Sequence, residues 1–106
     1  MATTADTHRR TLMSLRTIEL MVGDLPEVAA EWDDLPIDER MSWSLDWSSE
    51  MSALERLARA AADGTLPPEA VGRYRDLLRR VHAALPTLRR LNLYQPSVPD
   101  PLHAPD

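Results

Sequence analysis

Residues 37–62 read IDERMSWSLDWSSEMSALERLARAAA, and this stretch carries the clearest helical pattern of the chain. When successive residues are placed about 100° apart, its apolar residues gather within about a third of the circumference. The gathered residues are Trp43, Trp47, Met51, Leu54, Leu57, Ala58 and Ala61. The pair Asp63-Gly64 follows, and glycine commonly ends helices. The stretch therefore predicts a long amphipathic helix that turns one face to a core.

A second strip lies on the opposite side of this predicted helix, in its first half only. It consists of Met41, Leu45, Ser48 and Ser52. Farther along, the same side becomes charged. We therefore expect another element to lie across residues 41–52, and either the first helix of the chain or a second protein molecule could do so.

The dipeptide Leu-Pro occurs four times, with proline at positions 26, 36, 67 and 86. Proline disfavours helix for the residue before it but fits the first turn of a helix. Each Leu-Pro therefore predicts a helix start. The predicted helices are 9–22, 26–33, 37–62 and 68–84, with a short or kinked continuation over 86–93. Residues 18, 20 and 22 alternate as a strand would, but the spacing of Leu12, Leu15, Ile18 and Val22 favours a helix.

Composition agrees with a single all-α domain. The chain has 106 residues, of which 43% are hydrophobic, and it contains no Cys, no Phe and only three Gly. A chain of this length forms one domain, and so few turn and strand residues argue against a β fold. We predict an antiparallel bundle of four to five helices over 9–94. Disordered tails are expected at 1–8 and at 95–106, where four of twelve residues are Pro.

The sequence carries no sign of membrane insertion or secretion. No stretch approaches the roughly 20 apolar residues of a bilayer span. Residues 1–10 are polar and lack the apolar core of a signal peptide. We therefore expect a soluble, cytoplasmic protein.

Charge is divided along the chain. The segment 19–50 holds ten acidic residues and one Arg, a balance of −9, whereas 69–91 holds six Arg and two acidic residues, a balance of +4. One interpretation is that the two segments neutralise each other across antiparallel helices. The other is that the acidic segment, which also holds the three tryptophans, docks a basic partner.

The second interpretation gives the leading functional hypothesis, because binding hot spots often use tryptophan surrounded by charge. The candidate partner-binding residues are Glu31, Trp32, Asp33, Asp34, Trp43, Asp46 and Trp47. Trp32 is expected to be partly exposed. We predict a non-catalytic helical protein–protein interaction module or small regulatory subunit, comparable to antitoxins and anti-activators. Its partner would be another protein with a basic patch, and the chain could also form a homodimer.

A nucleic-acid-binding face is the alternative. It would consist of Arg73, Arg75, Arg79, Arg80, Arg89 and Arg90. The formal net charge of −5 opposes phosphate binding. The connection around 63–67 is also longer than the turn of a helix-turn-helix motif.

The sequence offers little for catalysis or for metal and cofactor binding. It has no G-x-S-x-G elbow and no phosphate-binding glycine loop. His8 and His103 fall in the predicted tails, which leaves His82 as the single histidine of a predicted helix. No Glu is followed three positions later by His, as a di-iron bundle requires. Glu27, Glu31, Asp34 and Asp38 could hold a hard cation only weakly. We predict no enzyme activity, no metal and no cofactor.

Glu50 stands out because its position falls within the apolar face of the helix at 37–62. An unpaired carboxylate there would be costly or protonated. We therefore predict an ion pair with an Arg of a neighbouring helix. The alternative is that Glu50 receives a cation from a bound partner.

Overall fold

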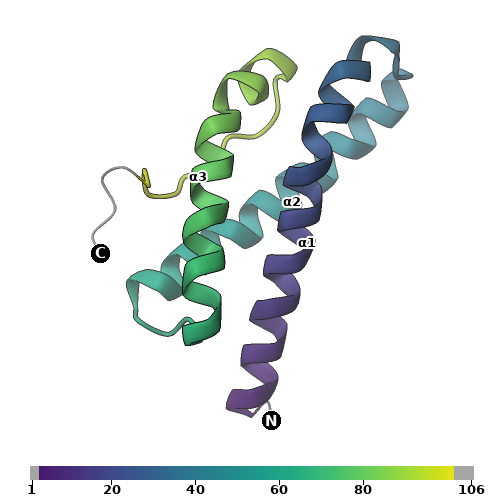
Figure 1. The fold of residues 1–106 in the computed structure, drawn as a ribbon. Helices are drawn as coiled ribbons and strands as arrows, with labels where there is room; N and C mark the ends of the chain where they lie inside the picture. The colour runs from purple at the N-terminus through teal and green to yellow at the C-terminus, as the bar shows by residue number, and fades with distance from the viewer. Residues whose placement is uncertain (1–2, 102–106) are drawn as a thin grey trace.

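The computed structural model describes residues 3–101. Within this range the chain forms three α-helices and no strand: α1 (Thr4–Glu31), α2 (Ile37–Ala62) and α3 (Pro68–Leu91), with a 3-10 helix, η1 (Trp32–Asp34), between the first two (Figure 1). The all-α class is confirmed. Among the described helices, none is both long and apolar enough to span a bilayer.

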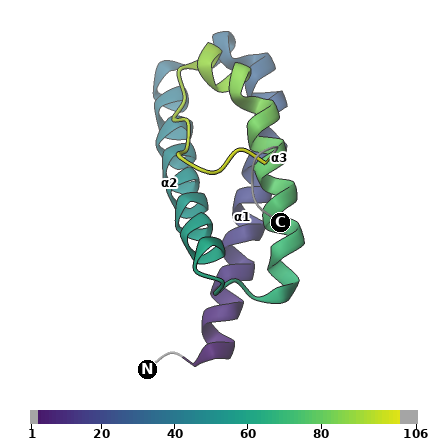
Figure 2. The same cartoon turned by 90° about the vertical axis from the view of Figure 1, so that its left-hand side faces the viewer.

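Helix α1 is the centre of the fold. It packs against both α2 and α3, whereas α2 and α3 make few direct contacts with each other. Figure 2 shows α2 and α3 on either side of the C-terminal part of the chain. The core lies where the apolar faces of the three helices meet. Its most deeply buried side chains are Leu15, Ile18, Trp47, Met51, Leu54, Leu77, Val81 and Leu88.

The predicted count of four to five helices is wrong, because two Leu-Pro pairs lie inside helices. Pro26 lies within α1 and Pro86 within α3. Each of these prolines is exposed, while the apolar spacing continues past it. In α1 the buried residues follow each other every three or four positions: Leu15, Ile18, Val22, Leu25 and Ala29. Continuous packing of this face compensates for the helix bond that Pro26 cannot make. The predicted helix at 26–33 is therefore the last part of α1 followed by η1.

The beginning of the chain also differs from the prediction of a disordered tail over 1–8. Helix α1 starts at Thr4, and Thr3 caps it. The Thr3 hydroxyl accepts a hydrogen bond from the Asp6 backbone N–H at 3.0 Å, and the Asp6 carboxylate accepts one from the Thr3 N–H at 3.4 Å. This reciprocal capping box stabilises a helix start. Residues 1–2 lie outside the described residues.

After α3, residues 93–101 form an extended segment, which we call the C-terminal strap. Asn92 ends α3 in the left-handed conformation, with φ of 58°. The strap then passes between α2 and α3 (Figure 2). Leu93 is buried, Val98 packs against the core, and the Trp47 indole N–H donates to the Tyr94 carbonyl at 2.9 Å. The described part of the predicted tail, 95–101, is thus extended, as its prolines favour, and lies against the bundle; residues 102–106 lie outside the described residues.

Glu55 of α2 holds the strap through one carboxylate oxygen. Its Oε2 accepts a hydrogen bond from the Tyr94 hydroxyl at 2.6 Å and another from the Ser97 backbone N–H at 2.7 Å. Both bonds favour the charged form, so they hold the pKa of Glu55 below its ordinary value of 4.5. The hydroxyl of Tyr94 has a raised pKa for the same reason.

The Glu55 contact predicts an acid-sensitive strap. Because the pKa of Glu55 is lowered in the folded chain, its stabilisation is present above pH 4.5 and is lost as the pH falls through the lowered value. In an NMR titration, the Ser97 amide proton should shift with a midpoint below 4.5. Glu55→Ala should remove this titration and lower the free energy of unfolding by about 1 kcal/mol. The control Asp24→Ala, at an exposed position inside α1, should do neither. A Ser97 amide that does not titrate would contradict the contact.

Candidate functional site

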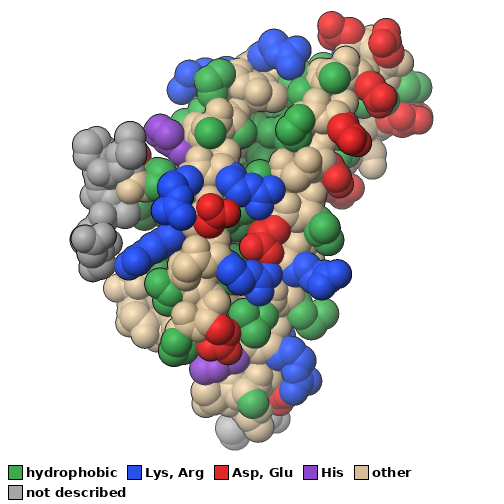
Figure 3. Space-filling view, in the orientation of Figure 1, with side chains coloured by type: hydrophobic (Ala, Val, Ile, Leu, Met, Phe, Trp, Pro, Cys, Tyr) green, Lys and Arg blue, Asp and Glu red, His purple; other side chains and the backbone are tan. Residues whose placement is uncertain are grey.

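The end of the molecule where α1, η1 and α2 meet is strongly acidic. Its six exposed carboxylates, which we call the acidic end, are Glu27, Glu31, Asp33, Asp34, Asp38 and Glu39. Figure 3 shows acidic side chains gathered there. Asp38 and Glu39 lie in the first turn of α2, where the helix dipole favours negative charge. With the residues of 3–101, none of the six makes an ion pair or a side-chain hydrogen bond.

The three tryptophans form one aromatic contact chain from the core to the acidic end. Trp43 and Trp47 stack with ring centroids 5.4 Å apart, and Trp32 meets Trp43 edge to face at 6.4 Å. Trp32 and Trp43 are half-buried, whereas the Trp47 side chain is fully buried. Trp47 was predicted to bind a partner, and this is corrected: it is a core residue that no partner can reach. Trp32 brings the aromatic chain to the surface.

An uncovered apolar strip on α2 lies beside Trp32. It consists of Ile37, Met41 and Leu45, which are 66%, 60% and 70% exposed, and we call it the docking strip. The residues follow each other four apart, so they share one side of the helix. The element expected across residues 41–52 therefore does not cover Met41 or Leu45 within the described part of the chain. Ile37 is missing from the strip proposed from sequence, although its spacing to Met41 is the same signal.

The docking strip forms one wall of a shallow groove of about 400 Å³. Trp32, at one end, and Leu91 with Asn92, at the end of α3, contribute other parts of its lining. Asp38 and Asp46 each follow a strip residue directly, so they lie along one edge of the strip. The groove thus combines exposed aliphatic side chains and Trp32 with the basic side chain of Arg40, while Asp38 and Asp46 lie beside the strip on α2.

Glu50 lies away from this groove, between α1 and α2. It is half-buried, and Arg10, Ser14 and Arg56 line the same surface depression. Burial raises the pKa of Glu50, the neighbouring charge of Asp46 raises it further, and Arg56 lowers it. The predicted ion pair with an Arg of another helix is corrected, because Glu50 makes no ion pair with any described residue. Although Arg10 is near, no ion pair joins it to this carboxylate.

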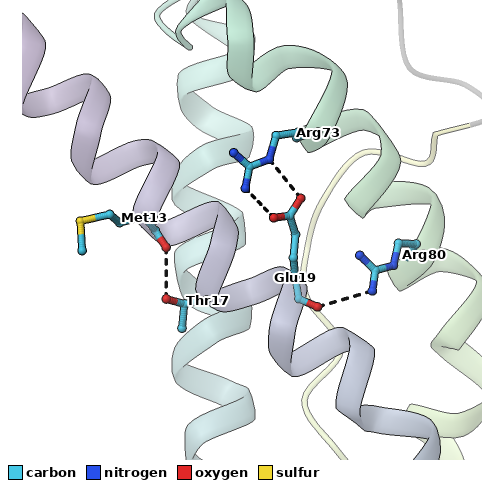
Figure 4. Close-up of polar contacts among 5 residues, drawn as sticks. All are labelled: Met13, Thr17, Glu19, Arg73 and Arg80. Carbon is cyan, nitrogen blue, oxygen red and sulfur yellow. Dashed lines mark hydrogen bonds and ion pairs between the residues drawn. The ribbon is translucent and has the colours of Figure 1, made fainter.

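The predicted Arg face of α3 is divided by contacts with α1. Arg73 forms a bidentate ion pair with Glu19, with an Nη2–Oε1 distance of 2.6 Å and an Nε–Oε2 distance of 3.2 Å. Arg80 donates to the Glu19 backbone carbonyl at 3.4 Å (Figure 4). Arg79 pairs with Asp76 on its own helix. Arg75, Arg89 and Arg90 are exposed. Two of the four central arginines therefore hold α1 and α3 together.

The Glu19–Arg73 contact also decides how far the acidic and basic segments neutralise each other. Among residues 3–101 it is the single ion pair that joins two different helices. Basic side chains at the end of α3 lie at the same end of the molecule as the acidic end (Figure 3), but no ion pair among residues 3–101 joins them to its carboxylates. Internal neutralisation between 19–50 and 69–91 is thus limited to Glu19, and the negative charge of the acidic end remains on the surface.

The residues considered for catalysis or metal binding are not brought together. His82 is exposed on α3. Within the described range, no three side chains of His, Cys, Asp or Glu are placed to hold one metal ion, and this includes Glu27, Glu31, Asp34 and Asp38.

Comparisons of the chain with protein-family models, with curated proteins and with solved structures find no match. Function therefore has to be inferred from the surface chemistry of this chain. The most distinctive region consists of Trp32, the docking strip, the acidic end and Asp46. We call these residues together the docking surface.

Proposed function

We propose that the protein is a non-catalytic interaction module or small regulatory subunit, and that its docking surface binds a basic amphipathic helix of another protein. The observation that carries the proposal is the exposed strip Ile37, Met41 and Leu45 beside carboxylates that make no ion pair within residues 3–101. Exposed apolar side chains grouped in this way are typical of binding surfaces.

The geometry of the docking strip suits a helix. Its residues extend over two turns of α2, about 12 Å at 1.5 Å per residue. A partner helix with apolar side chains three and four positions apart could lay its ridge along the groove. Trp32 offers a large apolar contact next to the strip, and the acidic end would attract the basic flanks of the partner before contact.

Two other occupants are less favoured. A homodimer through the same surface would bring two copies of the acidic end close together, and like charges oppose this. Nucleic acid would need the Arg face of α3, of which Arg73 and Arg80 are already used by Glu19. The proposal therefore commits to a basic helix.

A direct test uses a synthetic helical peptide with Leu at helical spacing and Lys on both flanks, titrated calorimetrically into the full chain. We expect saturable binding that weakens with salt. Leu45→Ser should weaken it about thirtyfold, the effect of losing a hot spot worth about 2 kcal/mol. Leu20→Ser is the matched control, because Leu20 is 60% exposed on α1, outside the docking surface. It should leave the affinity unchanged.

Three results would count against this function. The first is no saturable binding of the basic peptide, and the second is an equal loss in the two Leu variants. The third is a dimer in light scattering that Leu45→Ser dissociates. Tight, steeply salt-dependent binding to duplex DNA that Arg75→Gln and Arg79→Gln abolish would favour the nucleic-acid alternative instead.

A further inference from the structure

A second concave site lies at the other end of α2, away from the docking surface. It is a cavity of about 400 Å³ between the end of α2, the connection to α3 and the first turns of α3. Its walls are mainly apolar, with Ala58, Ala61, Leu66, Val71 and Leu78 among the lining residues. The size and the apolar lining fall within the range of small-molecule sites, about 300–1,000 Å³.

The C-terminal strap forms part of this cavity. Pro99 contributes to the lining, and the strap that carries it is held by the hydrogen bonds of Tyr94 and Ser97 to Glu55. Residues far apart in sequence thus line the space, because the strap passes between α2 and α3 (Figure 2).

Tyr74 and Arg75 are the lining residues that carry polar side-chain groups, and of the two only Arg75 is exposed. Tyr74 is 5% exposed, and its hydroxyl has no hydrogen-bond partner in the described structure. Burial raises the pKa of Tyr74 above its ordinary value of 10. Arg75 also lines the cavity and is exposed. Whereas Arg73 and Arg79 are paired with carboxylates, Arg75 forms no ion pair with residues 3–101.

We propose that this cavity binds a small aliphatic carboxylate. The alkyl body would lie among the alanine and leucine side chains. The carboxylate would form an ion pair with the guanidinium of Arg75 at the rim. An arginine favours a carboxylate because its planar N–H groups match the two oxygens. The apolar walls offer nothing to the many hydroxyls of a sugar, and a neutral alkane would leave Arg75 unused.

The test compares sodium octanoate with 1-octanol by calorimetry on the full chain. Octanoate should bind saturably, and Arg75→Gln should weaken it at least tenfold while leaving octanol binding unchanged. Arg90→Gln, an exposed arginine at the end of α3, is the matched control and should have no effect. Ala61→Phe should fill the cavity and abolish binding of both probes, whereas Ala30→Phe on the exposed side of α1 should not.

Two further measurements test the proposal even if the Ala61→Phe variant does not fold. On the wild-type chain, octanoate should shift the methyl resonances of Ala61, Val71 and Leu78 and leave that of Leu20 in place. Leu45→Ser should bind octanoate as the wild type does, which separates this site from the docking surface. Absence of saturable octanoate binding, equal effects of Arg75→Gln and Arg90→Gln, or methyl shifts confined to the docking strip would each overturn the proposal.

Discussion

Trp47→Ala is expected to lower the free energy of unfolding by about 4 kcal/mol, within the range of about 3–5 kcal/mol for large aromatic side chains in cores. The Trp47 side chain is fully buried and stacks on Trp43. Its removal leaves a cavity and also orphans the Tyr94 carbonyl, which accepts the indole N–H. Urea unfolding followed by circular dichroism at the helical band measures the loss without relying on tryptophan fluorescence.

Two further variants help to separate the contributions of the buried ring and of its N–H to this loss of stability. Trp32→Ala truncates the half-buried end of the same aromatic chain and should cost about 1 kcal/mol. Trp47→Phe keeps an aromatic ring but loses the N–H. Its loss of unfolding free energy should therefore lie between those of Trp32→Ala and Trp47→Ala. If Trp47→Ala costs no more than Trp32→Ala, Trp47 is not the core residue described here.

The helix at 37–62 could be predicted from sequence because all of its signals agree. A long core-facing apolar stripe, an acidic first turn and a closing Asp-Gly pair point to the same boundaries, and α2 has them (Ile37–Ala62). Leu-Pro is ambiguous by comparison, because proline fits the first turn of a helix but is also tolerated on an exposed helix side. The phase of the apolar pattern distinguishes the two cases: it continues across Pro26 and Pro86, which lie inside helices.

The sequence predicts which candidate site residues carry charged or aromatic side chains, but it does not predict how deeply each of these side chains is buried. Acidic residues such as Asp33 and Asp34 are exposed wherever the chain turns, and Trp32 beside them reaches the surface. Trp43 and Trp47 share one helix face, and periodicity alone does not tell which of them lies deeper. Depth depends on what covers the face, and here the C-terminal strap contributes to that cover. The strap has no period, so its contacts with Trp47 and Glu55 leave no sequence pattern.

Pro26→Ala is expected to stabilise the protein by about 2 kcal/mol. Proline within a helix costs about 3 kcal/mol relative to alanine, because it lacks the N–H and clashes with the preceding turn. Part of this gain is offset, by about 1 kcal/mol, because alanine gives the unfolded chain more freedom. Pro26 is exposed, so the substitution removes no core contact, while the neighbouring Leu25 remains buried. The change is measured as a rise in the urea midpoint at constant m-value.

Pro68→Ala is the matched control for this gain. Pro68 is the first residue of α3, where the missing N–H has no helical partner to lose and the fixed φ favours the helix start. Alanine there should give no stabilisation, and a small loss is expected from the freer unfolded chain. Stabilisation by Pro26→Ala but not by Pro68→Ala would show that α1 continues through residue 26 at an energetic cost. A loss of stability in Pro26→Ala would instead mean that the chain uses Pro26 to start a separate helix, and the three-helix description of residues 3–101 would fail.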